Sequence, residues 1–551
     1  MAVDEEDRNA RSRPVSDFID PEIGEKAGIL EVRIGTSPPV PFSASFQWPL
    51  LPAISSLELD SRKVRQGSLY FALPGLHVDG HDYINHALEL GAVAVVHEKA
   101  LREYREVALY LLVRNSRFAM SPLADAFYSF PSRSMGIIGV TGTEGKSTTV
   151  YLIYQLLNLL GKKAGFISTV QFGNGLNVEW NREHQTTPEA PRIHRLLGEM
   201  RQNGAEYAVV EASSHGLSKR TNRLGDIAFD AAVMTNVTHE HLEFHGTWEQ
   251  YRSDKAELFR ALDSFSHRKF GPKGDVPAFA VVNADDPSAA FFAAATKART
   301  FTFSTRGAAA DLSITRIESG KEGNSYDVYA ASTGKTFTVN DNLPGAFNAG
   351  NVLASLLVIS RLLSLDIDDL IHLVPALVPV RGRMTAISRG QPFEVCVDYA
   401  HTPSSFESIL PPLRKRLSTT GNRLICLFGS PGERDTQKRA LQGKIAAHYS
   451  DLVILADEDP RGEDPIAILE EIAQGCETDQ DKRHGMIRNE TLFLIPHRPE
   501  AIRKAFSLAR PGDLVLLLGK GHENSIIYAN GPVSYDEIRE AETALKEMGY
   551  K

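Results

Sequence analysis

Apolar runs of strand length alternate with amphipathic helical stretches along most of the chain. Between residues 133 and 380, strands that are apolar throughout are separated by helical patterns, which is typical of a parallel sheet covered on both faces. This segment is therefore predicted to form one wound α/β domain. Its strand-like runs lie at 136–140, 207–211, 231–235 and 278–283.

Residues 381–551 repeat this alternation and predict a second open α/β sheet. Residues 51–132 combine shorter apolar runs with one helical stretch, which predicts a small α/β module. Residues 1–50 mix charges with prolines and lack periodicity, so we expect a loosely ordered extension there. The strand-like runs of the last segment lie at 423–428, 452–455, 492–495 and 514–518.

A glycine-rich turn joins the first strand of the central segment to a helical run. Residues 139–149 read Gly-Val-Thr-Gly-Thr-Glu-Gly-Lys-Ser-Thr-Thr. Gly142 and Gly145 let the backbone approach a ligand closely, and its N–H groups and the start of the helix favour an anion. Lys146 adds a positive charge, and the Ser147 hydroxyl suits a magnesium ion. The turn predicts a site for a nucleoside triphosphate with Mg²⁺.

This turn departs from the general P-loop pattern, because Val140 stands where that pattern has its first glycine. A glycine-rich turn without a ligand is the alternative interpretation. Gly-Lys-Ser between a strand and a helix nevertheless favours a phosphate site. We expect ATP, since the sequence lacks the Asn-Lys-x-Asp signature for guanine.

Two polar clusters follow strand-like runs of the central segment. Residues 209–217 bring Glu211 to the end of a strand, and residues 235–246 do the same for His241. Ligands of open α/β sheets bind beyond the carboxyl ends of the strands. An isolated histidine is more often packed or on the surface than a ligand. Because these residues follow a phosphate loop, we expect Glu211 and His241 to complete a magnesium shell.

Composition narrows the class of protein. At 551 residues the chain is long enough for roughly two to four globular domains. Its net charge of −9 argues against wrapping nucleic acid or lying on an anionic membrane. The three cysteines lie far apart, which argues against disulfides and zinc. Without a signal pattern or a long apolar stretch, we expect a cytoplasmic protein.

These motifs, with others in the same order, resemble the Mur ligases of peptidoglycan synthesis, and most closely the branch that makes the UDP-MurNAc-tripeptide. The resemblance runs from about Asp60 to Glu537. Besides the turn and the two clusters, it is carried by Asp60-Ser-Arg-Lys-Val64, Pro74-Gly-Leu-His-Val-Asp-Gly80, Thr186-Thr-Pro-Glu189, Asn283-Ala-Asp-Asp286, Gly345-Ala-Phe-Asn348, Asp398-Tyr-Ala-His-Thr-Pro403, Gly432-Glu-Arg-Asp435, Asp459-Pro-Arg461 and Gly519-Lys-Gly-His-Glu523.

The resemblance implies an α/β protein of three domains: a small N-terminal α/β domain for the uridine nucleotide (51–132), a central P-loop ATPase-like parallel sheet (133–380) and a C-terminal Rossmann-like α/β domain for the amino acid (381–551). It implies an enzyme that uses ATP and Mg²⁺ to phosphorylate the D-Glu carboxylate of UDP-MurNAc-L-Ala-D-Glu, after which the amine of a diamino acid attacks the acyl phosphate. We expect a monomer that binds neither nucleic acid nor a membrane.

The resemblance also implies roles for individual residues. The nucleotide site would contain Gly142, Thr143, Gly145, Lys146, Ser147, Thr148, Asn283, Asn348, Arg383 and Asp398. Magnesium would be held by Ser147, Glu211, His241 and a carbamylated Lys255, and the catalytic residues would be Lys146, Glu211, His241 and Lys255. The UDP-linked substrate would meet Ser61, His77, Thr186, Thr187, Ser214 and Arg220. The amino acid would meet Arg434, Asp459, Arg461, Gly519 and Glu523.

The segment expected to choose the amino acid departs from the family pattern. Diaminopimelate-adding members typically carry Asp-Asn-Pro-Arg where this chain has Glu458-Asp459-Pro460-Arg461. Arg461 favours a substrate with a distal carboxylate, whereas Asp459 adds an anion that suits a distal ammonium. Lysine, ornithine and meso-diaminopimelate therefore all stay open.

Two other interpretations fit part of the pattern. One is a different ligase of the superfamily, such as a folylpolyglutamate synthetase, and the uridine-type N-terminal module argues against it. The other is a nucleotide-binding regulatory homologue that has lost catalysis. That interpretation predicts broken catalytic positions, whereas the catalytic residues implied by the resemblance are all present.

Overall fold

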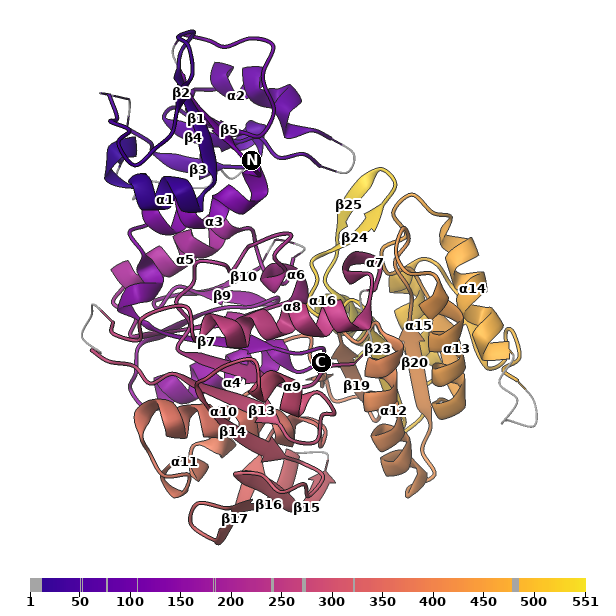
Figure 1. The fold of residues 1–551 in the computed structure, drawn as a ribbon. Helices are drawn as coiled ribbons and strands as arrows, with labels where there is room; N and C mark the ends of the chain where they lie inside the picture. The colour runs from indigo at the N-terminus through magenta and orange to yellow at the C-terminus, as the bar shows by residue number, and fades with distance from the viewer. Residues whose placement is uncertain are drawn as a thin grey trace.

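Three α/β units follow one another along the chain, each around its own sheet (Figure 1). The computed structural model describes residues 12–49, 51, 53–75, 78–106, 108–181, 183, 185–238, 242–269, 274–320, 323–477 and 485–551. The N-terminal unit sits on one end of the central unit, where α3 (Ser116–Phe127) packs against α5 (Ala190–Gln202). The C-terminal unit lies beside the central unit (Figure 1).

The N-terminal unit is a six-stranded sheet with strand order β2-β1-β6-β5-β4-β3. The four strands from β3 to β6 run parallel, while β1 and β2 add antiparallel strands beside β6. The strands are β1 (Ile29–Ile34), β2 (Val40–Pro41), β3 (Ser56–Glu58), β4 (Ser68–Phe71), β5 (Ala92–His97) and β6 (Leu109–Val113), and the remaining helices are α1 (Pro21–Lys26) and α2 (Ile84–Glu89).

Residues 15–41 belong to this unit, which differs from the loosely ordered extension expected from their composition. Helix α1 starts at Pro21, and the side chain of Asp20 caps it by accepting a hydrogen bond from the N–H of Ile23. Val15 and Phe18 are buried in the core of the same unit. The apolar side chains are few and irregularly spaced, so they give no periodic signal, yet they fill the core beside an antiparallel edge. Residues 1–11 lie outside the described residues.

The central unit is an eleven-stranded sheet with strand order β10-β9-β8-β11-β7-β12-β13-β14-β15-β16-β17. The strands from β8 to β15 in this order pair in parallel, as the apolar runs predict, and antiparallel strands extend both ends. The strands are β7 (Gly136–Thr141), β8 (Ala164–Ile167), β9 (Gln171–Gly173), β10 (Val178–Trp180), β11 (Tyr207–Glu211), β12 (Ala231–Met234), β13 (Phe279–Asn283), β14 (Arg299–Ser304), β15 (Leu312–Gly320), β16 (Gly323–Ala330) and β17 (Lys335–Asp341).

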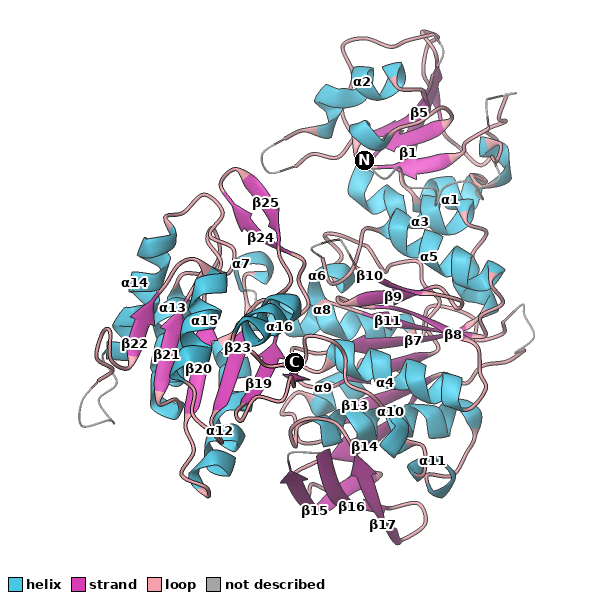
Figure 2. Ribbon diagram, turned by 180° about the vertical axis from the view of Figure 1, so that it is seen from behind, coloured by secondary structure: helices cyan, strands magenta, loops and turns pink. Residues whose placement is uncertain are grey.

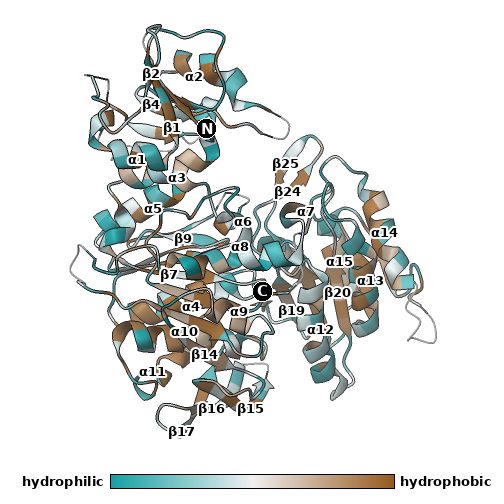
Figure 3. Ribbon diagram, viewed as in Figure 1, coloured by the Kyte–Doolittle hydropathy of each residue, from teal (hydrophilic) through white to brown (hydrophobic). Residues whose placement is uncertain are grey.

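Helices cover both faces of this sheet (Figure 2). One apolar core lies under α4 (Lys146–Leu159) and α10 (Asn348–Leu363), and a second lies under α5 and α8 (Trp248–Ala261). Apolar residues concentrate in the strands and in α4 and α10 (Figure 3). None of the helices in the described part of the chain is long and apolar enough to cross a membrane. The short helices are α6 (Ser214–Leu217), α7 (Leu242–His245), α9 (Ala289–Ala293) and α11 (Asp368–Ile371).

The C-terminal unit has strand order β18-β19-β23-β20-β21-β22, parallel except for the edge strand β18. The carboxyl ends of β19, β20, β21 and β23 lie at the same edge of this sheet. The elements are β18 (Thr385–Ile387), β19 (Glu394–Asp398), β20 (Leu424–Phe428), β21 (Leu452–Leu455), β22 (Leu492–Leu494), β23 (Leu514–Leu518), the hairpin β24 (Ser525–Tyr528) and β25 (Gly531–Ser534), and helices α12 (Pro403–Ser418), α13 (Gln437–Tyr449), α14 (Pro465–Glu477), α15 (Arg498–Leu508) and α16 (Glu537–Glu547).

Candidate functional site

The glycine-rich turn connects β7 to α4 and packs tightly against the rest of the central unit. Gly142 has φ +152°, and a Cβ there would lie 1.9 Å from the Thr235 hydroxyl oxygen. Gly145 has φ +83°, and a Cβ there would lie 2.5 Å from the side-chain oxygen of Asn351. Both positions therefore need glycine, for backbone conformation and for space.

Side chains from the end of β12 hold the turn in place. The N–H of Glu144 donates to the Asn236 side chain at 2.9 Å, and the Thr235 hydroxyl donates to the Glu144 carbonyl at 2.6 Å. Lys146 begins α4, and its ammonium donates to the Thr143 carbonyl at 2.7 Å. The lysine thus lies back over the turn, where its charge and the start of α4 favour an anion.

Glu211 ends β11 and is 1% exposed. Its carboxylate accepts hydrogen bonds from the Ser147 hydroxyl at 3.0 Å, from the N–H of Thr169 at 2.8 Å and from the Thr169 hydroxyl at 2.9 Å. A buried carboxylate is stable only when it is satisfied in this way. The contacts bring the oxygens of Ser147 and Glu211 together beside the turn.

These oxygens suit magnesium, which is bound in proteins by one or two carboxylates together with phosphate and water oxygens. Within the described ranges, no group of three His, Cys, Asp or Glu side chains could hold a metal ion. His241, which we expect in the same shell, lies outside the described residues.

Lys255 lies on α8 and is 2% exposed. Its amine donates to the Gly142 carbonyl at 2.6 Å and lies 4.5 Å from the ring centre of Tyr251. The next residue back, Asp254, pairs with the buried His245 at 2.7 Å. Burial alone would raise the pKa of Asp254, but the hydrogen bonds from His245 and Gln250 outweigh it and hold that pKa below its usual value.

A pocket opens between the turn and the C-terminal unit. Its lining includes several residues expected in the nucleotide site, namely Thr143, Gly145, Lys146, Ser147, Thr148, Asn348, Arg383 and Asp398. The Arg383 guanidinium lies 3.4 Å from the Ser147 hydroxyl and 4.7 Å from the ring centre of Tyr399. Arg383 therefore reaches across from the C-terminal unit to the phosphate turn.

Two expected nucleotide residues have mainly structural contacts. Both carboxylate oxygens of Asp398 accept backbone N–H bonds at 2.7 Å, from Met384 and Ala400, and burial raises the pKa of Asp398. The Asn283 side chain donates to the Thr235 carbonyl at 2.8 Å and is not part of the pocket lining. The pocket is also lined by three residues near the start of α12 that the sequence analysis did not name, Ser405, Ser408 and Ile409. The motif Asp398-Tyr-Ala-His-Thr-Pro403, which leads into this helix, was the available signal.

The residues expected to meet the UDP-linked substrate are spread over two units. Ser61 lies in the N-terminal unit, while Thr187 bonds to the carbonyl of Glu211 at 3.1 Å. Ser214 begins α6 and contacts His245, and Arg220 donates to the Phe244 carbonyl at 2.7 Å. Thr186 adjoins Thr187, and His77 lies outside the described residues.

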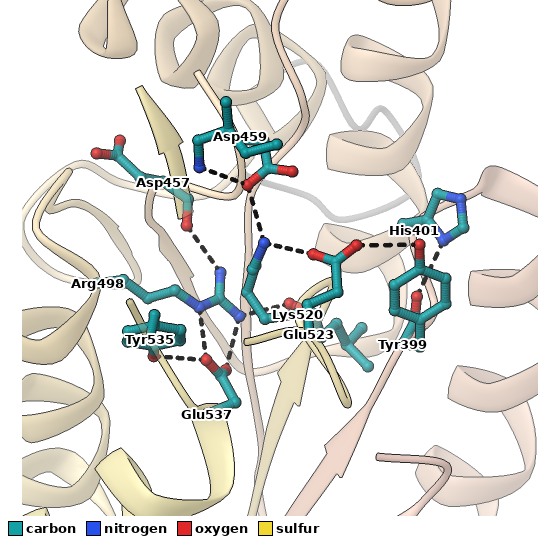
Figure 4. Close-up of polar contacts among 11 residues, drawn as sticks. Tyr399, His401, Asp457, Asp459, Arg498, Lys520, Glu523, Tyr535 and Glu537 are labelled. Carbon is teal, nitrogen blue, oxygen red and sulfur yellow. Dashed lines mark hydrogen bonds and ion pairs between the residues drawn. The ribbon is translucent and has the colours of Figure 1, made fainter. Parts of the chain in front are cut away.

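A fully buried lysine, Lys520, ties together the residues expected to bind the amino acid (Figure 4). Its ammonium lies 2.9 Å from the carboxylate of Asp459 and also pairs with Glu523. The Tyr399 hydroxyl donates to Glu523 at 3.3 Å. Sequence reasoning named Asp459, Gly519 and Glu523 without Lys520, although that lysine lies within Gly519-Lys-Gly-His-Glu523.

A second buried ion pair holds the same edge of the C-terminal sheet. Arg498 pairs with Glu537 at 2.7 Å, with both side chains fully buried. The same guanidinium donates to the carbonyls of Asp457, at 3.1 Å, and Leu518, at 2.6 Å (Figure 4). It therefore fixes the segments that follow β21 and β23, which carry the expected amino-acid residues.

The two arginines expected at the amino-acid site lie on loops beyond this edge. Arg461 has φ +55°, its N–H donates to the Ile527 carbonyl at 2.9 Å, and its buried Nε has no hydrogen-bond partner among the described residues. Arg434 is exposed in the loop between β20 and α13. A guanidinium N–H without a partner suits a carboxylate ligand.

The fold and the site define a class: an α/β protein whose P-loop-like turn faces a Rossmann-like C-terminal sheet across a pocket lined by both units. Three family models match the chain, namely the Mur ligase family catalytic domain over residues 53–128, the Mur ligase middle domain over 140–359 and the Mur ligase glutamate ligase domain over 382–521. The chain belongs to the Mur ligase family, whose members are ATP-dependent ligases of peptidoglycan precursor synthesis and related reactions.

Individual relatives agree with this assignment. The UDP-N-acetylmuramyl-tripeptide synthetase of Treponema denticola is 50% identical over 515 residues, covering 89% of this chain and 94% of the relative. The UDP-N-acetylmuramoyl-L-alanyl-D-glutamate--2,6-diaminopimelate ligase of Geobacillus kaustophilus is 36% identical over 503 residues, covering 90% and 96%. A solved structure of a UDP-N-acetylmuramoyl-L-alanyl-D-glutamate--2,6-diaminopimelate ligase is 28% identical, with TM-score 0.58, and covers 92% of this chain and 97% of its own.

Replacing Gly142 with alanine tests the turn. Because the new Cβ would lie 1.9 Å from the Thr235 hydroxyl, the turn must move, and we expect ATP affinity to fall at least about tenfold, or ~1.4 kcal/mol. Isothermal titration calorimetry measures this directly. Gly161→Ala is the control: it also has positive φ but no atom within 4 Å of the new Cβ, so ATP affinity should be unchanged. Equal ATP affinity in both variants contradicts the role of Gly142.

Proposed function

We propose that this chain adds a diamino acid to the D-Glu carboxylate of UDP-MurNAc-L-Ala-D-Glu, with conversion of ATP to ADP and inorganic phosphate, in the cytoplasm and as a monomer. The observation that carries the proposal is the cleft in which the phosphate turn, the Ser147–Glu211 pair and Arg383 meet. Relatives named as tripeptide synthetases, 50% identical over nearly the whole chain, support the choice of substrate.

The reaction needs charge neutralisation more than acid–base chemistry. The D-Glu carboxylate attacks the γ-phosphoryl group of ATP, ADP leaves, and an acyl phosphate forms; the amine then attacks the acyl carbon and inorganic phosphate leaves. Lys146 lies over the turn and Arg383 contacts it from the C-terminal unit, so both cations would offset negative charge on the transferred group. Holding both reactants in one cleft also accelerates the reaction, because the entropic cost of bringing them together is paid on binding.

Magnesium would be held by Ser147 and Glu211 together with His241, and it would supply further positive charge at the phosphates. Asn348, Thr143, Thr148 and the glycines of the turn would hold the nucleotide, while Asn283 would face its adenine and Asp398 would lie close to its ribose. Their present contacts keep the turn and the start of α12 in position.

We assign a carbamylated side chain to Lys255. Its amine is buried beside the Gly142 carbonyl, next to the turn, where an ammonium would repel a metal ion and a carbamate would bind one. Intact mass measured in bicarbonate should show the added group on the native protein and not on Lys255→Ala. A structure with bound substrates and an unmodified amine at Lys255 would contradict the assignment.

For the UDP-linked substrate, we assign Ser61 and His77 to the uridine end, and Thr186, Thr187, Ser214 and Arg220 to the muramyl peptide and its diphosphate. Thr187 and Ser214 support this because they adjoin Glu211 at the end of β11. The substrate would then extend from the N-terminal unit to the catalytic turn.

For the amino acid, we assign Arg434, Asp459, Arg461, Gly519 and Glu523. The ammonium of Lys520 neutralises part of the negative charge of Asp459 and Glu523. Asp459 therefore attracts a distal ammonium of the substrate less strongly than the sequence alone suggests. The unpartnered Nε of Arg461 favours a carboxylate on the substrate. Either an α-carboxylate or a distal carboxylate could bind this N–H, so lysine, ornithine and meso-diaminopimelate remain the candidates.

The purified protein with ATP, Mg²⁺ and UDP-MurNAc-L-Ala-D-Glu should release phosphate and form a tripeptide product with one of these three amino acids. Product mass identifies the amino acid. Lys146→Ala should fold normally and lose turnover by about a hundredfold or more, because it removes charge at the phosphates.

Phosphate release with a folate substrate in place of the UDP-linked dipeptide would instead support a folylpolyglutamate synthetase. ATP binding without turnover on any of the three amino acids would support a regulatory homologue. A near-normal rate in Lys146→Ala would contradict the role given to that lysine.

A further inference from the structure

A buried chain of three side chains lies beside the proposed substrate residues. Ser214 begins α6, His245 ends α7 and Asp254 lies on α8, and α6 packs against α8. The ring Nε2 of His245 is 3.1 Å from the Ser214 hydroxyl, and its Nδ1 is 2.7 Å from the Asp254 carboxylate. All three residues are at most 4% exposed. Nothing in the proposed chemistry uses His245.

The donors and acceptors around Asp254 fix the position of the imidazole proton. One carboxylate oxygen accepts from the Gln250 side-chain amide at 2.8 Å, and the other faces His245 Nδ1. A carboxylate accepts hydrogen bonds, so Nδ1 carries hydrogen. In the neutral ring Nε2 then carries a lone pair, and the Ser214 hydroxyl must donate to it.

This arrangement sets the direction in which Ser214 can bond to a ligand. A serine hydroxyl has one proton and two lone pairs, and its proton is committed to His245. The face of Ser214 that remains presents lone pairs, which accept from N–H or O–H groups and repel the oxygens of phosphates and carboxylates.

We propose that His245 is a positioning residue that makes Ser214 a hydrogen-bond acceptor for an N–H or O–H group of the UDP-linked dipeptide. The assignment rests on the proposed function and sharpens it, because it directs Ser214 to an amide or hydroxyl of the muramyl peptide and away from the diphosphate. Asp254 acts through His245, as the orienting carboxylate does in other serine–histidine–aspartate arrangements.

Two substitutions of His245 separate orientation from packing. In His245→Asn the side-chain amide can still donate a hydrogen bond to Asp254, but it falls short of Ser214. In His245→Gln the longer side chain brings its amide oxygen to Ser214, where it can accept a hydrogen bond from the hydroxyl. Binding of the UDP-linked dipeptide, measured by calorimetry, should weaken about three- to tenfold in His245→Asn, because one hydrogen bond to the substrate is lost. It should return close to the native value in His245→Gln, and ATP binding should stay unchanged in both.

Ser214→Ala should weaken dipeptide binding by a similar factor, and combining it with His245→Asn should weaken binding no further, because both remove the same hydrogen bond. The matched control is His267→Asn, the same substitution in another histidine–aspartate pair, His267–Asp230 at 3.0 Å, which lies at the amino ends of β12 and β7. It should leave dipeptide binding unchanged.

Nitrogen-15 NMR of the histidine-labelled protein reads the proton positions directly. We expect His245 to be protonated at Nδ1 and bare at Nε2. A proton on Nε2, or losses in Ser214→Ala and His245→Asn that multiply in the double variant, would overturn the assignment. If the native protein fails to bind the UDP-linked dipeptide, the proposed function fails, while the NMR spectrum still decides the direction of the Ser214 hydrogen bond.

Discussion

The buried carboxylate of Glu211 organises the centre of this protein. It lies at the end of the β11 strand and accepts three hydrogen bonds from Ser147 and Thr169. Because an unsatisfied buried carboxylate is costly, these contacts tie the first turn of α4 and the segment after β8 to one point. The carbonyl of Glu211 also binds Thr187, so the nucleotide turn and the proposed substrate segment share one support.

The C-terminal unit completes this centre with charges fixed by burial. Arg383 reaches the Ser147 hydroxyl from across the cleft. Lys520 holds Asp459 and Glu523 together, and Arg498 ties the loops after β21 and β23 to Glu537 (Figure 4). Carboxylates of the chain itself pair with Lys520 and Arg498, so this edge of the sheet is organised before an amino acid arrives. Such preorganisation lowers the cost of bringing the reactants together.

The parts that local sequence determines were predictable. Continuous apolar runs identify β7, β11, β12 and β13 of the central sheet and β20 to β23 of the C-terminal sheet, and the type and order of residues 142–147 identify the phosphate turn. Residues 15–41 gave no such signal, because their few apolar side chains are ordered only by packing against β6 and α3.

Other features depend on contacts between distant segments. Lys520 has its role because β21 and β23 end at one edge, which brings Asp459 to it from another part of the chain. Among the histidines of the clusters at 209–217 and 235–246, the sequence pattern singled out His241. The role of His245 comes from its pairing with Asp254 and from the packing of α6 against α8, which brings Ser214 to its ring.

The central claim is that the D-Glu carboxylate is activated as an acyl phosphate in the cleft between the turn and Arg383. The most direct test uses UDP-MurNAc-L-Ala-D-Glu with ¹⁸O in the D-Glu side-chain carboxylate, together with ATP, Mg²⁺ and the productive amino acid. If the carboxylate attacks the γ-phosphoryl group, one labelled oxygen leaves with the phosphate, and mass spectrometry will find ¹⁸O in the inorganic phosphate. Product formed with unlabelled phosphate would contradict the claim.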